Sequence, residues 1–217
     1  MTQANAKPGA ARRKTVLSLL VGGILGGLAS AAALLVIGSG TLGELGTSRE
    51  IAVLVGVVYL VCAIAVGFGV ANPGAGSRFL NVEDADELRE QRTMLANSAI
   101  STAAMGLALI LAAIAAPAGP VAAPLALAGV LGLLLLACIL GWRQQKRMDE
   151  FMKQLSHEAG AAAFYLLAIV GGCWALLAHL GYVAGPQPLD WLSMFVGLLL
   201  VSTMAAAAHR GLMVPRV

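Results

Sequence analysis

The chain has 217 residues, of which 59% are hydrophobic and 12% are charged, and its mean hydropathy is +0.85. Charged residues make up roughly a quarter of a typical soluble domain, so this composition excludes a water-facing globular surface and indicates a membrane protein. The formal net charge of +3 comes from short clusters of Lys and Arg. We expect these clusters to face lipid headgroups, and no nucleic-acid surface is predicted.

Six apolar segments without an internal charge predict six transmembrane helices. A helix needs about 20 apolar residues to cross about 30 Å of hydrocarbon, and a charge at its centre costs about 2.5–3.5 kcal/mol. We therefore expect an all-α, polytopic membrane protein with three helical hairpins, in which residues 1–15 are a cytoplasmic tail and 16–217 a membrane domain. The predicted spans are 16–38, 51–71, 95–116, 121–141, 159–183 and 191–208.

The distribution of cations predicts the orientation. Short loops rich in Lys and Arg are retained in the cytoplasm, so both termini are expected inside. Among the fourteen Lys and Arg residues, only Arg49 would then lie outside. The thirteen expected inside are Lys7, Arg12, Arg13, Lys14, Arg78, Arg89, Arg92, Arg143, Lys146, Arg147, Lys153, Arg210 and Arg216.

The first span has a second interpretation. Arg12, Arg13 and Lys14, followed by an apolar run and Ala29-Ser30-Ala31, also resemble a cleavable signal peptide. The apolar run continues past these small residues to Gly38, which is longer than the 7 to 15 residues of a signal peptide core. An uncleaved anchor is the favoured interpretation.

Two cytoplasmic connections are expected to form amphipathic segments at about 82–94 and 143–158, each leading into a span. Asp84 is a candidate N-cap of the first, with Glu87 three positions later, and Asp149 and Glu150 begin the helix of the second. Asp149-Glu150 and the Ala-rich span that follows resemble small multi-span bacterial membrane proteins. That likeness covers only part of the chain and implies no function.

An internal repeat is a further hypothesis. The pattern Asp-Glu-x-x-x-Gln occurs at residues 86–91 and again at 149–154, and Ala-Gly-Pro occurs at 118–120 and 184–186. Spans three and four would then be a hairpin repeated by spans five and six. Convergence is the alternative, because any helical hairpin can begin with acids and turn at Gly-Pro.

The strongest packing signal is a pair of overlapping Gly-x-x-x-Gly motifs in the first span, formed by Gly22 with Gly26 and by Gly23 with Gly27. Glycines at this spacing let another helix backbone approach closely. We therefore expect this face to pack against a neighbouring helix, in the same chain, in a second copy or in another protein.

Asn97, Ser98, Ser101 and Thr102 form a polar patch in the inner third of the third span, since positions four apart stack on one helix face. One hypothesis is a vestibule open to the cytoplasm. The other is structural: hydroxyl and amide groups bond across helices or to backbone carbonyls. The structural interpretation is favoured.

Tyr59, Trp174, His179 and Ser193 are candidates for a pocket in the outer half of the membrane. His179 and His209 are expected at opposite membrane faces, which disfavours a bis-histidine haem. The three Cys residues are on separate spans without a second metal ligand at suitable spacing, although Cys62 and Cys173 lie at comparable depth. The sequence predicts no cofactor and no metal site.

The function predicted from the sequence is non-catalytic, because no phosphate-binding loop and no nucleophile with an adjacent base are recognisable. We expect an accessory or assembly subunit of a bacterial inner membrane, with the lipid bilayer and a membrane protein or a second copy as partners. The alternative is a transporter or channel for a neutral small solute or a lipid, built from repeated hairpins. A membrane enzyme using His179 or the polar patch is a weaker third hypothesis.

Overall fold

The computed structural model describes residues 8–41, 45–79 and 85–212. Within these ranges it contains eight helices and no strand, which confirms the all-helical prediction. The helices are α1 (Pro8–Gly38), α2 (Thr47–Ala71), α3 (Pro73–Phe79), α4 (Ala85–Glu90), α5 (Arg92–Ala113), α6 (Ala123–Gln145), α7 (Glu150–His179) and α8 (Pro188–His209).

Five of these helices, α2, α5, α6, α7 and α8, are long and apolar enough to cross a membrane. They correspond to the last five predicted spans and indicate a multi-pass membrane protein. In the first predicted span, the apolar helical stretch Gly22–Gly38 is shorter than these five. The described part of the chain thus shows five candidate membrane-spanning helices.

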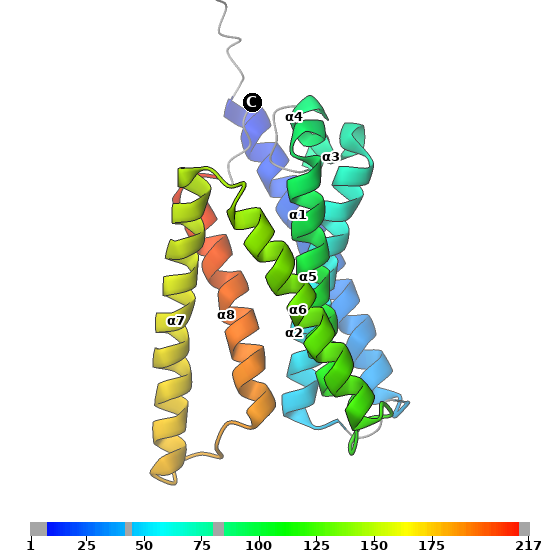
Figure 1. Ribbon diagram of the computed structural model, residues 1–217, viewed down its shortest axis with the longest axis vertical. Helices are drawn as coiled ribbons and strands as arrows, with labels where there is room; N and C mark the ends of the chain where they lie inside the picture. The colour runs from blue at the N-terminus through cyan, green and yellow to red at the C-terminus, as the bar shows by residue number, and fades with distance from the viewer. Residues whose placement is uncertain (1–7, 42–44, 80–84, 213–217) are drawn as a thin grey trace, which may run out of the picture.

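The long helices run up and down between two ends of the molecule (Figure 1). One end carries α3, α4, the start of α1 and the α6–α7 connection, and we call it the α4 end. The α1–α2, α5–α6 and α7–α8 connections lie at the other end, which we call the Gly119 end after a residue in the α5–α6 turn. Within the described ranges, Arg49 is the one Lys or Arg on the segments of the Gly119 end.

The two predicted amphipathic segments differ from each other in the structure. Residues 82–84, including the N-cap candidate Asp84, lie outside the described residues; α4 follows, and α5 begins at Arg92. Leu88 of α4 is only 1% exposed, so this short helix is packed against the protein. Residues 143–158 comprise the end of α6, a turn and the start of α7, whose N-cap Asp149 accepts a hydrogen bond from the Met152 N–H at 2.8 Å.

The centre of the bundle is the contact between α2 and α5, which are the most extensively packed pair. They cross at Gly56 and Gly106, where a Cβ on Gly56 would lie 2.7 Å from the Gly106 oxygen and one on Gly106 would lie 2.6 Å from the Gly56 oxygen. Only glycine permits this approach of two backbones. Both α1 and α8 pack against α2, and α6 packs against α5.

The helix α7 packs chiefly against α8. Gly171 makes room for the indole ring of Trp191, since a Cβ at position 171 would lie 2.6 Å from that ring. The neighbouring Gly172 has open space instead.

This pair of glycines gives a matched test of the α7–α8 contact. We expect Gly171→Val to displace Trp191 and to lower the free energy of unfolding by about 1–3 kcal/mol, the usual cost of overpacking. Gly172→Val should leave stability within about 0.5 kcal/mol of wild type, as surface substitutions do. Thermal unfolding in detergent with tryptophan fluorescence measures both, and equal stability of the two variants would contradict the assigned contact.

Large apolar side chains cover the outside of α6 and α7. Leu125, Leu131, Phe164 and Ile169 are each more than half exposed, as are many of their neighbours. Soluble monomers rarely expose contiguous apolar surface on this scale, whereas lipid chains solvate it. The outer helices are therefore suited to contact with hydrocarbon.

Candidate functional site

The polar patch of α5 is half-buried. Asn97, Ser98, Ser101 and Thr102 all have intermediate exposure. The Ser101 hydroxyl is buried and has no hydrogen-bond partner among the described residues. None of these four residues lines either of two cavities in the described part of the chain, so the structure does not connect the patch to either cavity.

The predicted outer-pocket residues are divided by the structure. Trp174 and Ser193 line one cavity of about 250 Å³ between α2, α7 and α8. Tyr59 lies buried between α2 and α8, where its hydroxyl donates to the Val196 oxygen at 2.8 Å. His179 is exposed at the end of α7. Only two of the four residues thus share a cavity.

The polar groups of this α7–α8 cavity are engaged in local structure. Ser193 Oγ donates to the Leu189 oxygen at 2.9 Å, and Trp174 Nε1 donates to the Ala184 oxygen at 2.8 Å. The Asp190 carboxylate accepts from the Gln187 N–H at 2.7 Å as part of a capping box that begins α8. These bonds satisfy groups that would otherwise be costly to bury, so they have a structural purpose without any ligand.

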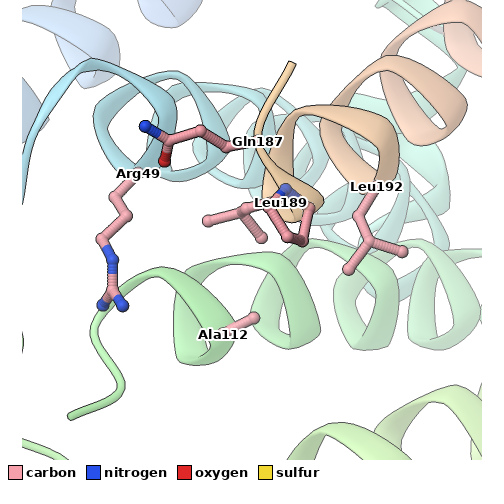
Figure 2. A pocket seen from close by; sticks show the side chains of 6 residues that line it. Arg49, Ala112, Gln187, Leu189 and Leu192 are labelled. Atoms are coloured by element: carbon pink, nitrogen blue, oxygen red, sulfur yellow. The ribbon is translucent and has the colours of Figure 1, made fainter. Parts of the chain in front are cut away.

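A second cavity, of about 300 Å³, lies at the Gly119 end. Figure 2 shows Arg49 and Gln187 at one edge of it and Leu189 and Leu192 further along, with Ala112 of α5 on another wall. Pro188 completes the lining. We call this the Arg49 cavity.

Arg49 joins two helices that are far apart in sequence. Its Nη1 donates to the Ala113 oxygen at 2.8 Å and to the Ala115 oxygen at 2.5 Å, so a side chain of α2 satisfies carbonyls at the end of α5. Helix C-termini leave such carbonyls without partners and carry partial negative charge, which a guanidinium complements. The sequence interpretation used Arg49 only to orient the chain. Its isolation outside the basic clusters was the available signal of a specific role.

The glycine face of α1 has no neighbour among the described residues. A Cβ at Gly22, Gly23, Gly26 or Gly27 would meet nothing within 4 Å. The helix instead packs through its last turns, where Ile37 and Ala33 belong to an apolar cluster with Leu45 and Ala52. Within the part of the chain that the structure describes, the motif predicted for close helix packing thus contacts no other helix.

The other candidate groups are dispersed. Among the described residues, no three His, Cys, Asp or Glu side chains are arranged to hold a metal ion. The three Cys residues are unpaired, and His157, His179 and His209 are exposed.

No protein-family model matches the chain, and neither the curated proteins nor the solved structures give a significant match. Two features of the described residues remain available for ligands or partners: the glycine face of α1 and the Arg49 cavity.

Proposed function

We propose that this chain is a six-span protein of a bacterial inner membrane that acts without catalysis, as an accessory or assembly subunit. In this proposal α1 is the first span, the spans form three hairpins, and both termini are cytoplasmic. The grouping of the described cations at the α4 end supports that orientation, because cytoplasmic loops retain Lys and Arg.

The observation that supports a subunit role is the uncovered glycine face of α1. Elsewhere the chain places its close-approach glycines against partners: Gly56 against Gly106, Gly129 against Leu111, and Gly171 against Trp191. The Gly22 to Gly27 face has the spacing for close approach, and no described residue outside α1 lies against it. A transmembrane helix of a partner protein would complete this contact.

The cavities favour a subunit over the alternative of a solute transporter. The polar groups lining the α7–α8 cavity are already hydrogen-bonded within the chain. A transport pathway for a neutral polar solute requires groups that are free to bond the solute at mid-membrane depth. Binding of a partner at the exposed glycine face requires only a transmembrane helix and no free polar group.

The test is purification in a mild detergent at native abundance, followed by mass spectrometry of copurifying proteins. We expect wild type to retain a partner membrane protein and Gly26→Leu to reduce its recovery about tenfold, because a bulky side chain prevents close helix approach. Gly132→Leu is the control, since Gly132 on α6 also has open space but belongs to no such motif.

Three results would contradict the proposal. Wild type recovered as a solitary monomer would exclude a stable subunit role, and equal recovery from both variants would remove the glycine face from it. A second copy of the chain as the sole copurifying protein would replace the partner protein by a homo-oligomer. Reporter fusions at Asp149 test the orientation separately, with a cytoplasmic signal expected.

A further inference from the structure

We propose that the Arg49 cavity binds an amphiphilic oxyanion: a phosphate or carboxylate head at Arg49 and Gln187, with an alkyl chain along α8. The cavity combines one cation and one amide at its edge with four apolar or small residues on its walls (Figure 2). A small polar solute would leave those walls unused, and an uncharged hydrocarbon would leave the cation without a counter-ion.

The head position follows from the guanidinium. Nη1 is occupied by the carbonyls of Ala113 and Ala115, and within the described residues nothing accepts a hydrogen bond from Nε or Nη2. Arginine presents its donors in a planar fork that matches the oxygens of phosphate and carboxylate. Because Nη1 is anchored, the remaining donors are held in place before a ligand arrives.

Figure 2 shows the Gln187 amide at the same edge of the cavity as Arg49, beside the start of the Arg49 side chain, with the guanidinium further along that edge. The nearby Asp190 carboxylate lines the other cavity and bonds the Gln187 backbone. Gln187 is itself exposed; its side-chain oxygen accepts the capping hydrogen bond from the Asp190 N–H, and its amide nitrogen remains to donate to a ligand oxygen.

The apolar walls provide the path for the chain of the ligand. Leu192 is 50% exposed at the cavity, and Phe195, one turn further along α8, is 48% exposed. Residues three apart lie on one helix face, so the two side chains continue the apolar wall toward mid-membrane. Arg49 is in the first turn of α2, at the end of a candidate span and thus at headgroup depth.

The test is native mass spectrometry of the full chain in detergent, titrated with phosphatidylglycerol or with phosphatidylcholine of the same acyl chains. We expect Gln187→Glu to weaken phosphatidylglycerol binding about tenfold, because it adds a negative charge at nearly constant shape beside the head. Phosphatidylcholine should bind more weakly than phosphatidylglycerol and be unaffected. Gln145→Glu, the same change on an exposed residue at the α4 end, should behave as wild type.

Arg49→Gln should also lose phosphatidylglycerol binding, but this variant removes the hydrogen bonds to α5 and can unfold. The deciding variant is therefore Gln187→Glu, whose melting temperature should be unchanged. Unchanged phosphatidylglycerol binding by Gln187→Glu would overturn the proposal, as would equal affinity of wild type for the two lipids. Inorganic phosphate at millimolar concentration is the third arm. Displacement of the lipid by phosphate alone would show a simple anion site and overturn the amphiphile assignment.

Discussion

Gly106→Ala should lower the free energy of unfolding by about 1–3 kcal/mol, the range for overpacking a close helix contact. The added Cβ would lie 2.6 Å from the Gly56 oxygen and 2.9 Å from the Tyr59 Cβ. The first of these atoms belongs to the backbone of α2, so no rotamer change relieves the overlap and the two helices must move apart. Unfolding in detergent, followed by circular dichroism, measures the change.

The control is Gly132→Ala on α6, where the new methyl group meets nothing within 4 Å. Alanine is favoured over glycine in a helix interior by about 0.5–1 kcal/mol, so this variant should be as stable as wild type or more stable. The two substitutions are chemically identical, so the difference between their effects on stability isolates the crossing of α2 and α5. Equal effects would contradict the packing.

A second readout locates the disturbance. Cys62 is half-buried and lies three residues beyond Tyr59 on α2, whereas Cys138 is exposed on α6. Separation of α2 from α5 in Gly106→Ala should raise the rate of maleimide labelling at Cys62 and leave the rate at Cys138 unchanged.

The apolar helices were predictable from the sequence because apolarity is a local property of a segment. The prediction of a span at 51–71 corresponds to α2, and that at 191–208 to α8. The helix α7 begins at Glu150, ahead of the span predicted from 159, because the amphipathic segment predicted to begin at Asp149 and Glu150 continues into that span as one helix. This first part of α7 contains Glu150, Lys153 and Glu158, so hydropathy alone excludes it from the span, but the helical backbone continues from the Asp149 cap without a break.

Helix pairing was not predictable, because it depends on which distant segments meet. The Gly22 to Gly27 motif is recognisable as a local pattern, whereas Gly56 and Gly106 are single glycines without that motif. A weaker signal was present: Ala99, Gly106 and Ala113 recur every seven residues on α5, and all three are buried. Small residues at that spacing mark one helix face, but they do not identify the partner helix.

The residues that share a cavity were not predictable either, for the same reason. Trp174 and Ser193 share a cavity because α7 and α8 are adjacent, but the Tyr59 hydroxyl is bonded to the Val196 oxygen and Tyr59 does not line that cavity. The Arg49 cavity depends on residues from α2, α5 and the start of α8. No local spacing links those three segments, so only the folded arrangement could bring Arg49 and Gln187 together.

The tripeptide Ala-Gly-Pro occurs in two connections whose backbones differ. At 118–120 the chain closes a tight turn, in which the Gly119 N–H donates to the Ala115 oxygen at 3.2 Å and the Ala116 N–H to the Val121 oxygen at 2.7 Å. At 184–186 the glycine is in open surroundings, since a Cβ at Gly185 would meet only the Ala178 Cβ at 3.6 Å. The shared letters therefore do not imply a shared turn geometry.

Gly119→Ala should consequently destabilise the protein by about 2 kcal/mol or more, the range expected when a substitution forces backbone strain. The added Cβ would overlap the carbonyl group of Ile114, which is backbone and cannot move without opening the turn. Opening it also displaces the Ala115 oxygen and so weakens the anchor of Arg49.

Gly185→Ala is the matched control, because its methyl group makes an ordinary van der Waals contact, and its melting temperature in detergent should equal that of wild type. If Gly119→Ala melts at the same temperature as Gly185→Ala, the close approach in the α5–α6 turn is wrong. If Gly119→Ala is destabilised, phosphatidylglycerol binding by its folded fraction gives an independent result. That binding should be weaker than in wild type, because the turn positions the guanidinium that we propose binds the headgroup.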